Sequence, residues 1–275
     1  MDISVKKFFC GRGLGIACLM LSSFAMGACN DAAGKKGQAD SGEESRPDAA
    51  ITKMMRAISD GDAEGFAAIC VYPVQRPYPL KDIDDATAMA DYFPVLMDDS
   101  IRDVMKHRKP ADWERFGWRG WSFGDDTPIW YDDGVQGIDY VSKAERGLIR
   151  ILSREELMTL SPEYRDGWTP VATLIGIDHG NVYRIDSKGD VYRLMGFDSP
   201  DNVGGVPSLI MSGSLDLEGS ADSRVYVFSD SIGGKIEYLP DGEPPVRIFI
   251  SRPGSEEEYE NVRPGYWRDV VHPMP

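Results

Sequence analysis

The sequence predicts an α+β protein: helices packed on a curved antiparallel sheet, followed by an all-β unit, either a sandwich or a barrel. Three observations carry this prediction. Apolar residues recur with the helical period before residue 110, and aromatic residues alternate with small ones between 116 and 141. Short strand-like runs bounded by turn residues fill the chain after residue 170. We therefore expect five segments: 1–28, a flexible tether at 29–47, an α+β domain at 48–160, a linker at 161–170 and a β domain at 171–275.

One apolar face predicts the first helix. Asp48 is placed to cap its start, and the sequence Asp60-Gly61-Asp62 interrupts the pattern. A second short helix is expected to follow and to end at Tyr72-Pro73. The apolar face, at positions i, i+3, i+4 and i+7, consists of Ile51, Met54, Met55 and Ile58, and the second helix carries Phe66, Ile69 and Cys70.

Two more helices are expected before residue 110. One begins after Asp85 and runs to Tyr92, and Pro94 is expected to end it because proline disfavours helix in the preceding residue. The next ends with positive charge at 106–109, which complements the helix dipole. Its apolar face consists of Met97, Ile101, Val104 and Met105.

The period then changes to that of a sheet. Aromatic residues alternate from Phe116 to Phe123 and shift phase at Gly120, which indicates a bulge or bend. Ser153 followed by Glu156 is typical of a capping box and predicts a short helix ending at Leu160. Further strands are predicted at Ile129–Tyr131, Gly137–Val141 and Leu148–Leu152.

The second half of the chain predicts strands throughout. The pattern Val-Tyr-Arg occurs at 182–184 and again at 191–193, and the turn at 186–190 predicts a β-hairpin. The acidic run 256–258 is expected to be a solvated loop, with no helix of useful length after it. Several short strands at this spacing indicate a sandwich or barrel. The other strands are expected at Val171–Ile177, Leu209–Leu217, Val225–Phe228, Lys235–Leu239 and Val246–Ser251.

Charge restricts the classes of partner. The chain has 275 residues and a net charge of −15; removing residues 1–28, with three basic and one acidic residue, leaves −17. Such acidity argues against nucleic acid or anionic lipid headgroups as partners, because both are repelled. It is compatible with cationic ligands and with a simple solvated surface.

Four cysteines are present, and we expect no intrachain disulfide. Two of them precede residue 29, and Cys70 lies in an apolar context that predicts a small buried hydrophobe. The histidines are far apart and lack the spacing of metal ligands. The pairs Asp125-Asp126 and Asp132-Asp133 do not match a calcium loop and are interpreted as turn residues. The histidines are His107, His179 and His272.

The N-terminus combines a positive start, an apolar run from Leu14 to Met26 and small residues before Cys29. Thirteen apolar residues fall short of the ~20 that a membrane-spanning helix needs. The layout resembles a bacterial lipoprotein signal with its lipobox. The resemblance implies that Cys29 becomes the first mature residue, carries acyl chains and attaches the protein to a membrane of the cell envelope. An ordinary cleaved signal peptide and an uncleaved anchor remain alternatives.

Residues 48–152 resemble the NTF2-like, cone-shaped α+β domain. The likeness lies in a pattern of turns and aromatic residues: Ala57-Ile58 with Gly61-Asp62, Tyr72-Pro73, Asp112-Trp113, Gly117-Trp118-Arg119-Gly120 and Pro128-Ile129-Trp130-Tyr131. Such cones enclose a pocket, which in enzymatic members holds an acid–base pair, and they often dimerise through the sheet. The resemblance implies as pocket candidates Tyr72, Asp112, Trp118, Arg119, Trp130 and Asp132, with Asp112 as proton acceptor and Arg119 as its partner or an anion ligand.

Two hypotheses for function follow. The first is a membrane-anchored envelope protein that binds a small ligand or another envelope protein without catalysis, with no cofactor or metal. It rests on the anchor, the tether and two domains that lack a phosphate-binding glycine loop or a Gly-x-Ser-x-Gly motif. The second is a hydrolase or isomerase that uses Asp112 and Arg119 in the cone pocket. An aromatic stripe on a bent sheet is more often core, so the sequence favours the first.

Overall fold

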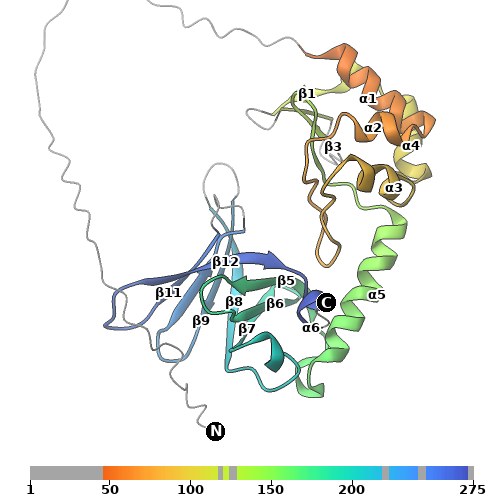
Figure 1. The fold of residues 1–275 in the computed structure, drawn as a ribbon. Helices are drawn as coiled ribbons and strands as arrows, with labels where there is room; N and C mark the ends of the chain where they lie inside the picture. The colour runs from red at the N-terminus through yellow and green to blue at the C-terminus, as the bar shows by residue number, and fades with distance from the viewer. Residues whose placement is uncertain (1–45, 117–119, 124–128, 219–222, 241–245, 272–275) are drawn as a thin grey trace, which may run out of the picture.

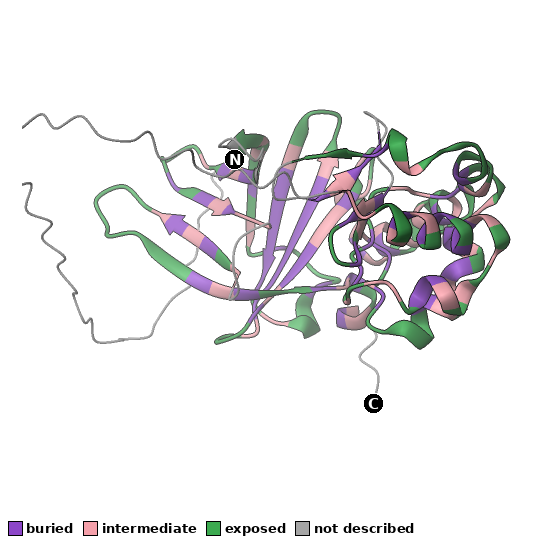
Figure 2. Ribbon diagram, turned by 90° about the horizontal axis from the view of Figure 1, so that it is seen from above, coloured by how far each residue is buried: buried purple, intermediate pink, exposed green. Residues whose placement is uncertain are grey.

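A computed structural model describes residues 46–116, 120–123, 129–218, 223–240 and 246–271. It confirms a mixed α+β fold in which helices accompany a four-stranded sheet, and a separate eight-stranded antiparallel sheet closes into a barrel. Figure 1 shows the two parts joined by one long helix, α5. In Figure 2 the buried segments gather in the strands of the barrel and on the inner sides of the helices.

The first part is built on four helices. The predicted apolar face of the first helix is confirmed, since all four of its residues are buried. Pro94 does not end the third helix as predicted, because the helix continues two residues beyond it. Proline removes only one backbone donor there, and burial of Leu96 and Phe93 favours the last turn. The helices are α1 (Asp48–Asp60), α2 (Ala63–Ala67), α3 (Ala86–Leu96) and α4 (Asp99–His107).

A small antiparallel sheet follows the 3-10 helix η1 (Pro110–Asp112) and packs its apolar residues with the helices in one core. The predicted strand from Phe116 to Phe123 with a bulge or bend at Gly120 is not found, because Glu114–Arg115 and Trp121–Ser122 are two strands that pair antiparallel. Gly120 itself requires glycine: its φ is +86°, and an added Cβ would lie 2.5 Å from the Tyr131 carbonyl oxygen. The order is sequential, and the strands are β1 (Glu114–Arg115), β2 (Trp121–Ser122), β3 (Ile129–Tyr131) and β4 (Val135–Ile138).

The segment after this sheet differs from the prediction. Lys143–Thr159 is a single helix, α5, so the predicted strand at Leu148–Leu152 and the capping box at Ser153 are both wrong. The capping box is Ser142 with Glu145, eleven residues earlier. The apolar run 148–152 has the composition of a strand, but the real cap upstream starts a helix that passes through it.

The second part is a barrel, which decides between the two predicted β architectures. Each strand pairs with the next in sequence, and β12 pairs with β5 to close the sheet. The predicted hairpin is confirmed, with pairing from Val182–Phe197 to Lys188–Val191. The strands are β5 (Thr169–Gly176), β6 (Val182–Lys188), β7 (Val191–Phe197), β8 (Leu209–Glu218), β9 (Ser223–Ser229), β10 (Lys235–Tyr238), β11 (Arg247–Ser251) and β12 (Glu258–Gly265).

Two elements at the end of the chain were not predicted. The acidic residue Glu258 opens strand β12, and a short helix, α6 (Trp267–Val271), follows it. Trp267 is fully buried against the outer surface of the barrel, where it packs with Phe197 at 5.6 Å between ring centroids. Alternate residues of β6 and β7 are therefore buried on both sides, inside the barrel and beneath α5 and α6.

Candidate functional site

The two parts meet where the loop between α2 and α3 reaches the barrel (Figure 1). The hydroxyl of Tyr78 in this loop lies 2.8 Å from the Thr173 hydroxyl of β5, and it accepts a hydrogen bond of 3.3 Å from the backbone N–H of Trp267. Nearby, the hydroxyl of Tyr266 accepts a bond from the backbone N–H of Asp82 at 2.9 Å. The loop therefore connects α6 and β5 with the helical part through hydrogen bonds of two tyrosines.

A buried carboxylate, Glu156 of α5, lies at this junction. The hydroxyl of Tyr78 donates to it, at 3.1 and 3.0 Å from its two oxygens. Burial raises the pKa of Glu156 from 4.5 to about 7, although the charge of Arg184 and the Tyr78 hydrogen bond both act to lower it. Glu156 therefore changes its protonation state close to neutral pH.

Arg184, the cation that faces Glu156, also interacts with a second carboxylate, Asp186. Nη1 of Arg184 lies 3.5 Å from the Glu156 carboxylate, while its Nε donates to Asp186 at 2.8 Å. Asp186 also accepts from Nε of Arg193 at 3.0 Å. Arg184 is completely buried, lies 4.5 Å from the Trp267 ring centroid, and its two terminal nitrogens have no hydrogen-bond partner among the described residues. Because Asp186 takes most of its hydrogen bonding, Arg184 compensates Glu156 incompletely.

Two hollows adjoin this cluster, and α6 contributes to both. The smaller is a cavity of about 230 Å³ lined by Glu156, Thr159 and Trp267 together with Pro79 and Arg268. The indole N–H of Trp267 donates to the Thr159 hydroxyl at 2.6 Å, so one wall is fixed. A carboxylate with a pKa of about 7 thus lines a partly open pocket of about 230 Å³.

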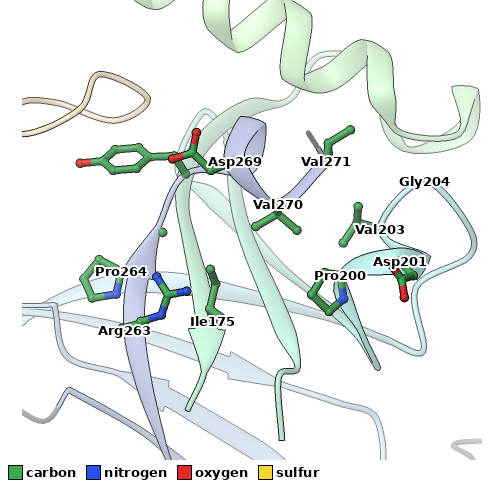
Figure 3. A pocket seen from close by; sticks show the side chains of 12 residues that line it. Ile175, Pro200, Asp201, Val203, Gly204, Arg263, Pro264, Asp269, Val270 and Val271 are labelled. Carbon is green, nitrogen blue, oxygen red and sulfur yellow. The ribbon is translucent and has the colours of Figure 1, made fainter. Parts of the chain in front are cut away.

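The larger hollow is an open groove of about 670 Å³ between β12, α6 and the 3-10 helix η4 (Pro200–Asn202). Figure 3 shows Val270 on α6 beside Val203, which follows η4, with Arg263 on β12 and Ile175 on β5. The two valines are buried and form an apolar floor, whereas Arg263 is exposed at the rim. The groove can therefore take an apolar group beside one that accepts hydrogen bonds from a guanidinium.

The residues proposed from the NTF2 resemblance lie elsewhere. The hydroxyl of Tyr72 donates to the Ala67 carbonyl at 2.7 Å. The Asp112 carboxylate is exposed and accepts from the Lys109 backbone N–H at 2.8 Å. The indole of Trp130 donates to Asp139 at 2.7 Å, and Asp132 is exposed. Trp118, Arg119 and Cys29 lie outside the described residues, so the structure does not place Asp112 relative to Arg119 and leaves lipidation of Cys29 a prediction.

The remaining candidates have local roles. Cys70 is partly buried against the core, its thiol lies 3.4 Å from the Phe66 carbonyl, and burial raises its pKa to about 12. It is therefore a neutral thiol at physiological pH, as expected of a small packed side chain. His107 is exposed and within hydrogen-bond distance of the Asp103 carbonyl, and His179 is exposed in a turn. Asp125-Asp126 and His272 fall outside the described residues.

Sequence reasoning missed the junction cluster. The local pattern predicts a capping box at Glu156 and a hairpin at Arg184 and Asp186, and it indicates no function for any of the three. A signal was present: Arg184, Asp186 and Arg193 fall on one side of two paired strands, where charged residues in an otherwise apolar hairpin indicate a covered polar cluster. Which helix covers them depends on tertiary packing.

Comparison with known protein families, with curated proteins and with solved structures found no significant match. The described part of the chain contains no helix long and apolar enough to cross a membrane. Function must therefore be argued from the site itself.

Proposed function

We propose that this chain is a lipid-anchored protein of the bacterial cell envelope, attached through Cys29, whose NTF2-like domain and barrel bind a ligand at their junction. The groove between η4, β12 and α6 is the observation that carries the binding function. Ligand sites are concave, mostly apolar and equipped with a few polar groups. The groove has an apolar floor of Val203 and Val270 and one exposed cation, Arg263.

The ligand that fits best carries an apolar group next to a carboxylate, as the apolar side chain and C-terminus of a peptide do. The charged residues that line the groove are Arg263 and two aspartates. Asp269 pairs with Lys81 at 2.6 Å, and Asp201 is exposed on η4, across the groove from Arg263 (Figure 3). Arg263 is positioned to bind a carboxylate through two parallel hydrogen bonds. An apolar group that packs on the two valines is removed from water.

Photo-cross-linking in cells tests this assignment. A benzophenone amino acid at Asp201, an exposed residue of the groove that leaves Arg263 in place, should give a specific adduct. The same probe at Ile232, an exposed turn residue of the barrel, should not. Gly204→Trp should abolish the adduct by filling the groove. The added Cβ has room, because the nearest atom beyond the adjacent residues is the Thr159 carbonyl oxygen at 3.7 Å, and circular dichroism checks that the variant is folded. Equal adducts at Asp201 and Ile232 reject a site in the groove.

The anchor has its own test, which does not depend on the groove. Cells fed labelled palmitate should label the wild-type chain, and Cys29→Ala should remove the label and release the protein into the soluble fraction. A wild-type chain that stays unlabelled and soluble overturns the lipoprotein assignment. It would favour ordinary secretion.

An acid–base enzyme is the second candidate, and its best support lies at Glu156 rather than at Asp112. A carboxyl group with a pKa of about 7 in a cavity is suited to transfer protons in hydrolysis or isomerisation. A panel of chromogenic esters and glycosides tests it. Turnover that inflects near pH 7 and disappears in Glu156→Gln supports the enzyme; no turnover, or turnover unchanged in this variant, rejects it.

A further inference from the structure

Helix α5 has an unusual distribution of side chains. Its buried residues are polar, namely Glu145, Ser153 and Glu156. Three of its apolar residues are instead exposed: Leu148 to 38%, Ile151 to 57% and Met158 to 58%. They share one side of the helix, because positions separated by three and seven residues lie close together on a helix of 3.6 residues per turn. Figure 1 shows α5 running from the helical part of the molecule to the barrel.

A row of cations runs beside these apolar residues. Arg146, Arg150 and Arg154 are spaced four residues apart, and Lys143 begins the helix; all four are exposed. Against them α5 has one exposed acidic residue, Glu155, because its other two glutamates are buried. Within the described ranges, none of the four cations forms an ion pair.

Helix stability does not explain this row. Lys143 and Arg146 lie in the first turn of α5, where the helix dipole favours negative rather than positive charge. The row also stands out in a chain with a net charge of −15, because none of its many carboxylates forms an ion pair with these side chains within the described ranges; Asp98 accepts from the backbone N–H of Lys143 at 3.0 Å, not from its ammonium group. Unpaired cations next to exposed apolar side chains are the composition of a helix that lies at a membrane interface.

We propose that this side of α5, formed by the four cations with Leu148, Ile151 and Met158 and here called the α5 stripe, docks on anionic lipid headgroups. Guanidinium groups donate paired hydrogen bonds to phosphate, and the apolar side chains enter the headgroup boundary. The stripe is straight and roughly 20 Å long, so it presents its charges to a plane. An acidic protein segment would satisfy the cations but leave no reason for three apolar side chains in line with them.

The acidity of the whole chain does not prevent this contact. Exposed charges are screened beyond about 8 Å at physiological ionic strength, so the membrane responds to the residues nearest to it. Composition therefore argues against anionic lipids for the average surface, whereas the α5 stripe is a local exception. This proposal depends on the proposed lipid anchor in one respect only: the anchor brings α5 close to a bilayer.

Vesicle sedimentation of the purified full chain tests the proposal. Vesicles of phosphatidylcholine alone report the contribution of the N-terminal anchor, and vesicles that also contain phosphatidylglycerol add that of the α5 stripe. We expect tighter binding to the anionic vesicles, decreasing with salt. Each cation near an anionic surface contributes roughly fivefold, so Arg150→Glu with Arg154→Glu should weaken this additional binding tenfold or more.

The matched control is Lys53→Glu with Arg56→Glu, which makes the same change of charge at two exposed positions on α1. It should bind anionic vesicles as the wild type does, and circular dichroism checks that all variants are folded. Ile151→Gln with Met158→Gln should weaken binding while keeping the preference for phosphatidylglycerol. Three results overturn the proposal: equal binding to both vesicles, equal loss in both charge variants, or binding to polyglutamate without lipid preference. Absence of binding to neutral vesicles speaks against the anchor instead.

Discussion

Each end of α5 buries a glutamate, and the two glutamates differ in how fully a nearby arginine neutralises their charge. Glu145, at the start, meets Arg76 in two parallel hydrogen bonds of 2.9 Å, and both side chains are fully buried. Arg76 also donates to the Ile138 carbonyl at 2.6 Å. Glu156, near the end, has an arginine 3.5 Å away that bonds Asp186 instead. One pair is satisfied, and the other leaves charge uncompensated.

The difference shows what burial of the same residue type can produce. At Glu145 the bonded carboxylate fixes the loop of Arg76 to the start of α5 and serves the fold. At Glu156 burial raises the pKa to about 7, and the charge of Arg184 offsets only part of that rise, beside a pocket and a groove. Perturbed titration next to concave surface is a mark of functional sites. The end of α5 at the barrel is therefore the better place to look for function.

The largest expected effect comes from breaking the satisfied pair. Arg76→Met leaves Glu145 buried without its partner, and we expect a loss of about 3–5 kcal/mol of unfolding free energy. Urea unfolding followed by circular dichroism measures it. Adding Glu145→Gln should restore part of the stability, because a neutral side chain needs no cation. A double variant no more stable than Arg76→Met would show that the pair is not what stabilises this end.

The second effect concerns pH. The pKa of Glu156 is higher in the folded protein than its ordinary value of 4.5, so the folded state binds the proton more tightly. This site therefore contributes stability at low pH that is lost as pH rises from 4.5 to about 7. The loss should be on the order of 3 kcal/mol across that window. In Glu156→Gln the unfolding free energy should no longer show this loss between pH 4.5 and about 7. If it falls with pH as steeply as in the wild type, the assignment of the loss to Glu156 is wrong.

Tyr78 should modify that titration. The hydrogen bond from Tyr78 lowers the pKa of Glu156. Tyr78→Phe removes this bond, so the pKa of Glu156, and with it the midpoint of the pH-dependent loss of stability, should rise. Stability should fall by about 1–2 kcal/mol. Tyr72→Phe is a matched control, because its hydroxyl bonds the Ala67 carbonyl and no carboxylate. It should cost a similar amount and leave the midpoint in place; equal shifts in both variants refute the link.

The smallest effect is expected at the surface pair between Lys81 and Asp269. Both side chains are more than 40% exposed, at 44% and 41%, although their atoms approach to 2.6 Å. Exposed pairs contribute about 0–1 kcal/mol and are screened by salt. A double-mutant cycle with Lys81→Ala and Asp269→Ala should give a coupling energy in that range. A larger, salt-insensitive value would mean that this contact, rather than the buried cluster, holds the two parts together.

Periodic patterns predicted the local structure well where one face of an element is buried. The apolar face of α1 and the hairpin of β6 and β7 are examples, since burial on one side leaves a regular trace in the sequence. The prediction failed for α5 because this helix buries Glu145 and Glu156 and exposes Ile151, which reverses the usual pattern of buried apolar and exposed charged residues. The prediction also failed for β12, because the acidic residues at its start and Pro264 near its end are typical of a loop.

The sequence by itself determined the two kinds of domain, the acidic average charge and most individual elements, because these depend on neighbours within a few residues. Tertiary structure decided closure of the barrel, where β12 pairs with β5 more than eighty residues earlier in the chain. It also decided which carboxylate is compensated. Whether Arg184 serves Glu156 or Asp186 depends on distances between side chains of separate elements, and no local pattern encodes those distances.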